Sequence, residues 1–274
     1  MKIFDFLPEG TQGCYVKAYL QTAWTKEEME KMPALPAVLI CPGGGYETVA
    51  SRAAEPVAKE YLAANYHAFV LSYSVGDKAK DFQPLIQLAS TMVHIRAHAV
   101  EWHIDPNRIA VWGSSAGGHL AASLGTLHND RKFLDVWNKK AQTLFSIRPN
   151  AMVLGYPVIT ADEFAHKRSI ERVSGAVEGE EKYYYFGLDK HVDEQTPQTF
   201  LCHTVADSCV PVENSLRFGA ALAAAKVPFE MHILPDGDHG MSVCTMEVGT
   251  ADSYNRRWVE WSIQWLNRVL EFQT

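Results

Sequence analysis

The sequence predicts an α/β protein, in which a mostly parallel sheet carries helices on both faces. Short continuous apolar runs, which are typical of parallel strands buried on both sides, alternate along the chain with longer stretches whose apolar residues recur every three or four positions. The chain has 274 residues, of which 47% are hydrophobic and 21% charged, so it can bury a large core. We therefore expect a single domain over residues 1–274.

The strands are predicted from their side-chain patterns, taken in chain order. Residues 14–21 alternate apolar with polar side chains, which is typical of an edge strand with one wet face, so we expect this strand to be antiparallel. The strands that follow are continuous apolar runs and are expected in the parallel centre of the sheet. They are predicted at residues 37–41, 67–75, 108–113, 151–158, 199–205 and 229–235.

Helical periodicity lies between these strands and after the last one. The clearest helices are predicted at residues 53–64, 84–103, 116–127, 212–226 and 254–271. Tryptophans and aliphatic residues repeat along one face of the last of these helices, which indicates core packing. Residues 160–198 interrupt the alternation with a polar stretch too long for an ordinary connection, so we expect an insertion that lies over the sheet as a partial lid.

Charge and cysteine content restrict the partners and the location of the protein. The formal net charge is −7 and no run of lysine or arginine occurs, so nucleic acid is not an expected partner. The N-terminus MKIFDFLPEG lacks an apolar signal core and no apolar run approaches membrane-spanning length, so we expect a cytoplasmic protein without membrane contact. The five cysteines lack C-x-x-C spacing and are expected to be reduced thiols.

A candidate nucleophile lies in residues 113–117, GSSAG, which match the pattern G-x-S-x-G. An apolar strand precedes this motif and a helix of small residues follows it, which is the context that a strained turn carrying an exposed serine requires. Ser115 holds the central position, and the N–H of Ala116 is expected to form half of an oxyanion hole. For the motif taken alone, a serine that only caps the helix is the alternative.

Residues 41–47, CPGGGYE, supply a second signal after the first central strand. Consecutive glycines let bare backbone approach a substrate, and the N–H groups of Gly44 and Gly45 are the candidates for the remaining oxyanion donors. A phosphate-binding loop is the alternative, but neither a P-loop Lys-Ser/Thr nor a G-x-G-x-x-G spacing follows. We therefore favour the oxyanion interpretation.

A serine nucleophile needs a base, and the base needs a carboxylate that orients it. Asp207 and His239 each follow a predicted strand, so both lie at the strand ends where open α/β sheets place their ligand sites. Asp236 and Asp238 are too near His239 along the chain to reach its far ring nitrogen easily and are assigned to turn formation. The sequence thus predicts Ser115, Asp207 and His239 as the catalytic residues.

The other histidines considered are assigned no chemistry. His94, His98 and His103 share a predicted helix, but no nearby acidic residue completes a metal site, so packing or surface roles are favoured. His119, within the helix after the nucleophile, is expected to pack or to support the site rather than to transfer protons. No metal and no organic cofactor is expected.

Several segments together resemble the acetyl-xylan-esterase-like, or carbohydrate-esterase-like, branch of the α/β-hydrolases. They are PGGGY with EPVA, GSSAGGHLAA, and the stretch from TPQTFLCHTVADSCVPVENS to LPDGDHG. The resemblance implies the α/β-hydrolase fold, with Ser115 as nucleophile, His239 as base and Asp207 as acid. It also implies a small-molecule substrate, namely a short acyl ester and in particular an O-acetyl group on a sugar such as a xylo-oligosaccharide.

Aromatic residues extend this expectation to substrate contacts. Tyr183, Tyr184 and Tyr185 of the insertion, with Tyr46 of the glycine loop, are predicted to present ring faces to a sugar. The alternative is that they anchor the insertion or form a subunit interface, and hence a homo-oligomer. Rival activities on the same fold are those of a lipase, an arylformamidase or a peptidase, and a non-catalytic binding module is the rival outside catalysis.

Overall fold

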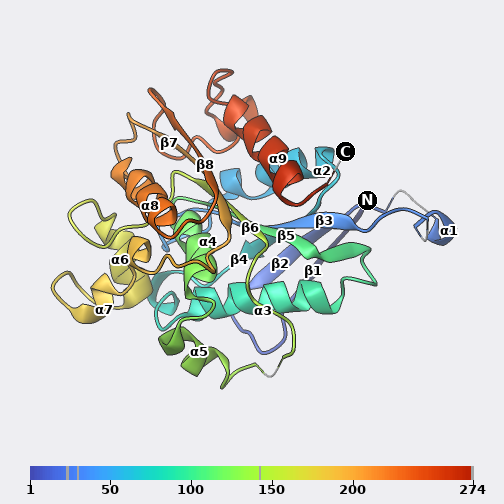
Figure 1. The fold of residues 1–274 in the computed structure, drawn as a ribbon, viewed down its shortest axis with the longest axis horizontal. Coiled ribbons are helices and arrows are strands. Elements are labelled where there is room, and N and C mark those ends of the chain that lie inside the picture. Colours follow the sequence, from blue (N-terminus) through green and yellow to red (C-terminus); the bar gives the residue numbers. More distant parts are fainter. Residues whose placement is uncertain (23–24, 30, 142, 273–274) are drawn as a thin grey trace.

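The computed structural model describes residues 1–22, 25–29, 31–141 and 143–272. In this part of the chain, eight strands form one sheet in the order β1-β2-β4-β3-β5-β6-β7-β8 (Figure 1). β1 and β2 are antiparallel to their neighbours, whereas β3 to β8 run parallel. The strands are β1 (Lys2–Phe6), β2 (Tyr15–Leu20), β3 (Leu35–Cys41), β4 (His67–Ser72), β5 (Ile104–Ser114), β6 (Ala151–Gly155), β7 (Gln198–Thr204) and β8 (Phe229–Leu234).

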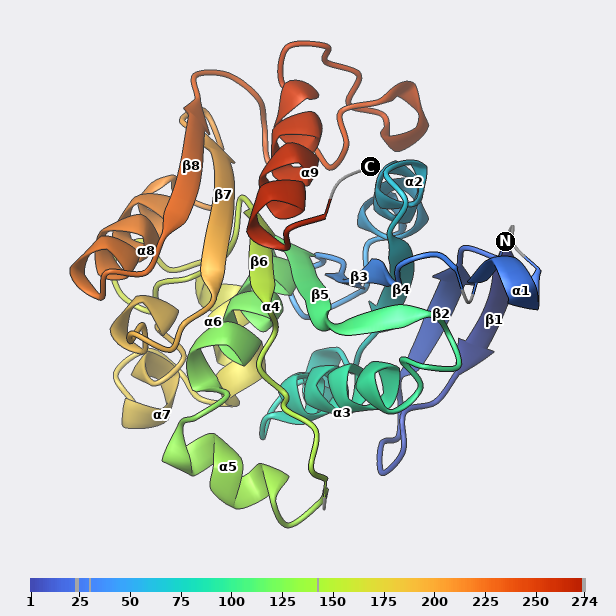
Figure 2. The same ribbon diagram turned by 45° about the vertical axis from the view of Figure 1, so that its right-hand side comes forward.

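Helices cover both faces of the sheet. α2 and α9 pack on one face, and α3, α4 and α8 pack on the other (Figure 2). Among the described residues, no helix combines the length and apolar character needed to cross a membrane. The α-helices are α1 (Lys26–Met29), α2 (Glu55–Ala63), α3 (Gln83–Ala97), α4 (Ala116–Leu127), α5 (Arg131–Trp137), α6 (Lys167–Ser174), α7 (Glu181–Tyr184), α8 (Glu213–Ala224) and α9 (Arg257–Val269). Short 3₁₀ helices lie at Ser51–Ala53, Gly76–Lys78, Leu188–Lys190 and Met246–Val248.

Strand β3 shows why a continuous apolar run belongs in the centre of the sheet. Leu39 joins the hydrophobic cluster under α3 and α4, whereas Val38 and Ile40 join the cluster under α2 and α9. Because successive side chains of a strand point to opposite faces, one apolar strand contributes to both cores. The predicted fold class is confirmed, and Trp258 and Trp265 of α9 are buried core residues as expected.

Neither β1 nor the short helices α1 and α5 are predicted from the sequence, and the end of one helix is predicted too late. β1 is a five-residue edge strand with exposed and half-buried side chains, so it contains no continuous apolar run. α5 is seven residues long, and its start is fixed by Asp130, whose carboxylate accepts from the N–H of Phe133. The helix predicted over 84–103 ends at Ala97, and residues 98–103 form turns that lead into β5.

The insertion, residues 160–198, contains α6 and α7 and lies beside α8 (Figure 1). Arg172 of α6 donates to the backbone carbonyl of Gly45 over 3.1 Å and forms an ion pair with Glu47 over 2.7 Å. The insertion is therefore fixed directly to the glycine loop that follows β3.

Candidate active site

Ser115 lies half-buried at the turn between β5 and α4. Its backbone has φ 55° and ψ −126°, a conformation that costs a residue with a side chain on the order of 1–3 kcal/mol. A Cβ on Gly113 would lie 2.1 Å from the carbonyl oxygen of Gly117, and a Cβ on Gly117 would lie 2.0 Å from that of Cys41. The two glycines of the motif are thus a steric requirement of the turn that carries the serine.

The side chains of Ser115, His239 and Asp207 meet at the carboxyl ends of the parallel strands. His239 lies in the loop after β8, and Asp207 lies in the loop after β7. The Ser115 hydroxyl donates to Nε2 of His239 over 2.8 Å, and Nδ1–H of His239 donates to Oδ2 of Asp207 over 2.7 Å. The structure therefore brings the three predicted residues together in the order that base-assisted attack by a serine requires.

Asp238 and Asp236 shape the turn that carries His239. Oδ1 of Asp238 accepts from the backbone N–H of His239 over 2.8 Å and from Oγ of Ser208 over 3.0 Å. The backbone carbonyl of Asp236 accepts from Nδ2 of Asn255 over 2.9 Å. These contacts agree with the turn roles predicted for both residues. The carboxylate that contacts the His239 ring is that of Asp207.

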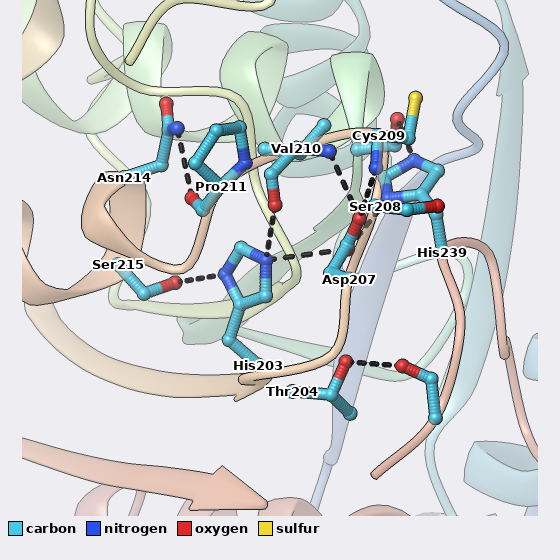
Figure 3. Close-up of polar contacts among 12 residues, drawn as sticks. His203, Thr204, Asp207, Ser208, Cys209, Val210, Pro211, Asn214, Ser215 and His239 are labelled. Carbon is cyan, nitrogen blue, oxygen red and sulfur yellow. Dashed lines mark hydrogen bonds and ion pairs between the residues drawn. The ribbon is translucent and has the colours of Figure 1, made fainter. Parts of the chain in front are cut away.

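Asp207 is buried, yet its surroundings favour the ionised carboxylate. Oδ1 accepts from the backbone N–H groups of Cys209 and Val210, each over 2.9 Å (Figure 3). Burial acts to raise the pKa of Asp207, but hydrogen bonds from His203 and His239, the charge of His239 and the N–H of Val210 together hold that pKa well below its ordinary value. The carboxylate is therefore negative when it orients the His239 ring.

A cavity of about 220 Å³ opens beside Ser115. This volume is below the roughly 300–1,000 Å³ of pockets that hold drug-sized ligands, so the cavity suits a small group. The insertion contributes His166 to its wall, which places one residue of the predicted lid at the site. Among the side chains of the wall, Arg52, Tyr156, His166 and Cys209 are not predicted from the sequence as site residues.

The glycine loop that follows β3 also contributes to the wall of the cavity. Gly43, Gly44 and Gly45 all line the cavity, and a Cβ on Gly43 would lie 3.0 Å from Cβ of Ser115. Gly44 has φ 129° and Gly45 has φ 64°, which side chains rarely adopt. Ala116 is the first residue of α4, where backbone N–H groups lack acceptors within the helix. These positions fit the predicted oxyanion hole, whose role stays a prediction.

The prediction that Tyr46 and Tyr183 present ring faces to a sugar is wrong, whereas that for Tyr184 and Tyr185 stays a prediction. Within the described residues, none of Tyr46, Tyr183, Tyr184 and Tyr185 lines the cavity beside Ser115. Tyr46 and Tyr183 have no exposed surface at all, so neither ring offers a face to a ligand. Tyr184 is exposed, but it is not part of the cavity wall.

The contacts of Tyr46 and Tyr185 show the alternative role, which is to anchor the insertion. The hydroxyl of Tyr46 donates to Nδ1 of His119 over 2.9 Å, and Nε2 of that ring donates to the backbone carbonyl of Phe186 over 2.9 Å. Burial lowers the pKa of His119 to about 4, so the ring is neutral and can accept from Tyr46. The hydroxyl of Tyr185 donates to Oδ1 of Asp130 over 2.5 Å. His119 therefore packs between Tyr46 and Phe186, which is one of the two roles predicted for it.

His94 and His98 belong to an aromatic stack rather than to a metal site. Their ring centroids are 4.2 Å apart, and Phe6 of β1 stacks on His94 with a centroid distance of 4.3 Å. Trp102 stacks on His98 with a centroid distance of 4.8 Å. In the described ranges, no group of three histidine, cysteine, aspartate or glutamate side chains is placed to hold a metal ion. These two histidines thus pack α3 against the edge of the sheet.

The structure has the arrangement of the α/β-hydrolases. Its features are a strained serine turn after a buried strand, a hydrogen-bonded Ser-His-Asp set and a mostly parallel sheet. The family model described as BD-FAE matches residues 25–222. The chain therefore belongs to the BD-FAE family.

Two curated relatives are larger proteins. Endo-1,4-beta-xylanase B of Butyrivibrio fibrisolvens is 36% identical over 213 residues, which cover 77% of this chain and 33% of that protein. Acetylxylan esterase of Xylanibacter ruminicola is 28% identical over 225 residues, which cover 78% of this chain and 42% of that protein. The chain thus spans less than half the length of either relative.

Solved structures match over nearly the whole chain. The acetyl ester-xyloside bifunctional hydrolase from Caldicellulosiruptor lactoaceticus has a TM-score of 0.80 and 33% identity, and the match covers 95% of this chain and 89% of that one. The carboxylesterase Cest-2923 from Lactobacillus plantarum has a TM-score of 0.86 at 23% identity over 100% of both chains, which shows the fold alone. The comparisons confirm the family resemblance and support a carboxylic ester hydrolase.

Proposed function

We propose that the protein is a serine carboxylesterase that releases short acyl groups, chiefly acetyl, from small carbohydrates such as xylo-oligosaccharides. The observation that carries the proposal is the hydrogen-bonded set of Ser115, His239 and Asp207 at the wall of a cavity of about 220 Å³. Relatives named acetylxylan esterase and acetyl ester-xyloside bifunctional hydrolase support an ester substrate and a sugar derived from xylan.

The reaction then follows from the geometry. His239 takes the proton of Ser115 as Oγ attacks the ester carbonyl carbon, and the N–H groups of Gly44, Gly45 and Ala116 stabilise the negative oxygen. His239 returns this proton to the departing alcohol, which leaves an acyl group on the serine. Water then attacks the acyl-enzyme with the same base, which releases the carboxylic acid and restores the hydroxyl.

The size of the cavity predicts a preference for short acyl chains. We expect kcat/KM for 4-nitrophenyl acetate to exceed that for the octanoate by at least about tenfold, because a chain too long for the cavity clashes with its wall and displaces the ester carbonyl from Ser115. The measurement is kcat/KM for acyl chains of increasing length, together with acetate release from acetylated xylo-oligosaccharides.

The same measurements, together with assays of an aminoacyl amide and of a fluorophosphonate probe, separate the rival activities. A preference for the octanoate would favour a lipase, and cleavage of an aminoacyl amide without cleavage of esters would favour a peptidase. A folded protein that neither cleaves esters nor reacts with a fluorophosphonate at Ser115 would be a binding module instead.

The rate is expected to fall on the acid side as a single ionisation. Only a neutral His239 ring can accept the Ser115 proton, so the rate is lost as that ring becomes protonated. Because the pKa of Asp207 is lowered, its carboxylate stays ionised while a histidine gains its proton, so Asp207 adds no second step in that range. The measurement is kcat/KM against pH, and a rate that stays flat down to about pH 4 would contradict a histidine base.

A further inference from the structure

A second histidine, His203, lies against the Asp207 carboxylate on the side away from His239 (Figure 3). It belongs to β7 and has no exposed surface. Its Nε2 is 3.0 Å from the backbone carbonyl oxygen of Val210 and 3.3 Å from Oδ2 of Asp207. Its Nδ1 is 2.8 Å from Oγ of Ser215, which belongs to α8. Both ring nitrogens of this buried histidine therefore have partners.

These partners determine where His203 carries its proton. A carbonyl oxygen and an ionised carboxylate accept hydrogen bonds and do not donate them, so Nε2 carries a hydrogen that bonds to Val210 and also faces Asp207. The hydroxyl of Ser215 can donate to Nδ1, which completes a neutral ring with its proton on Nε2. Ser215 thus keeps the proton of His203 on Nε2 by donating to Nδ1, whereas Asp207 keeps the proton of His239 on Nδ1 by accepting from it.

The two carboxylate oxygens of Asp207 contact different partners. Oδ1 of Asp207 accepts from the backbone N–H groups of Cys209 and Val210, which fixes the loop after β7. Oδ2 faces N–H donors of two rings, His239 at 2.7 Å and His203 at 3.3 Å. Because a buried carboxylate is stable only when its acceptor sites are paired, the His203 donor helps to hold Oδ2 in the direction of His239.

We propose that His203 is a positioning residue that acts on the reaction through Asp207. Its Nε2–H keeps Oδ2 aligned with Nδ1 of His239, and this alignment leaves the other ring nitrogen of His239 free to accept from Ser115. The inference rests on the proposed function, because it takes Ser115 and His239 as the reacting pair. A purely structural histidine would hold the loop through Val210 and leave the alignment of the carboxylate unchanged.

Two substitutions keep different ring nitrogens, and the thermal unfolding temperatures of the two variants, which we expect to be alike, separate a lost alignment of the carboxylate from a loosened loop at Val210. The amide nitrogen of glutamine in His203→Gln reaches the position of Nε2 and can donate to Asp207, whereas that of asparagine in His203→Asn reaches only the position of Nδ1. We expect kcat of His203→Asn to fall about ten- to a hundredfold with little change in KM, the size expected for a lost hydrogen bond to a charged group. We expect kcat of His203→Gln to stay within about threefold of the unmodified protein.

Phosphonylation of Ser115 by a fluorophosphonate gives a second readout that does not depend on the choice of ester. We expect the rate of labelling to fall in His203→Asn and to be retained in His203→Gln. Ser215→Ala, which removes the donor to Nδ1, is expected to slow labelling as well. Ser262→Ala is the matched control, because it deletes another buried serine hydroxyl, which contacts Tyr61 over 2.8 Å on the face of the sheet covered by α9.

The outcomes distinguish this inference from the proposed function. If the unmodified protein reacts with neither esters nor the probe, the proposed function fails and the inference with it. If the unmodified protein reacts and the two His203 variants are equally active or equally impaired, His203 is structural and the inference alone is overturned. Should neither His203 variant fold, a labelling rate of Ser215→Ala equal to that of Ser262→Ala overturns it.

Discussion

Ser115→Ala is expected to lower kcat for ester hydrolysis by about six orders of magnitude while the fold is retained. The substitution deletes the oxygen that donates to Nε2 of His239 and that would carry the acyl group. The serine and the histidine of such a set act as a unit, so the loss of either costs about as much as the loss of the whole set. Initial rates measure the effect, and the thermal unfolding temperature, which we expect to be nearly unchanged, verifies the fold.

Ser114→Ala is the matched control for this prediction. Ser114 is the neighbouring serine in the motif and ends β5, where its side chain is almost fully buried. Its loss is expected to reduce kcat by less than about tenfold. If Ser114→Ala were inactive and Ser115→Ala active, the turn would present Ser114 and not Ser115 to the substrate.

The proposed catalytic residues can be predicted from the sequence, because each of them lies next to a recognisable local sequence pattern. The turn at Ser115 cannot form without small residues on both sides, so its glycines are visible in the sequence. Asp207 and His239 each follow an apolar strand, and parallel strands end at a common edge of the sheet. The topology therefore brings together residues that are far apart along the chain.

The walls of the cavity are not visible in the sequence, because the direction of a loop side chain is set by contacts with distant segments. The tyrosines show this most clearly. An aromatic residue in a polar stretch can bind a ligand or anchor the stretch, and the pattern does not contain the partner that decides between them. For Tyr46 the partner is His119, and for Tyr185 it is Asp130. The role of His203 cannot be predicted from the sequence for the same reason. Its contact with Asp207 exists only in the folded loop.

Asp207→Asn is expected to lower kcat by about 10⁴-fold, the loss that the equivalent change causes in a chymotrypsin-type protease. Asparagine keeps the shape of the side chain but exchanges one acceptor oxygen for a donor group. Its oxygen can still accept from the N–H groups of Cys209 and Val210, so the loop after β7 is expected to keep its conformation. The measurement is kcat at a pH where a histidine base is neutral.

The local contacts explain why the loss is large. With its oxygen held by the loop, the new amide group takes the place of Oδ2 and directs N–H groups at the N–H donors of His203 and His239. His239 avoids this clash by moving its proton to Nε2, and that nitrogen then cannot accept from Ser115. The negative charge that stabilises a protonated His239 during the reaction is lost at the same time.

Asp238→Asn is the matched control, because it makes the same chemical change beside the same histidine. Oδ1 of Asp238 accepts from the backbone N–H of His239 and from Oγ of Ser208, and the amide oxygen of asparagine can accept both hydrogen bonds. We therefore expect kcat of Asp238→Asn to stay within about tenfold of the unmodified protein. If Asp207→Asn kept full activity and Asp238→Asn lost it, Asp238 would be the residue that orients His239. The proposed positioning role of His203 would then have no basis, because it acts through Asp207.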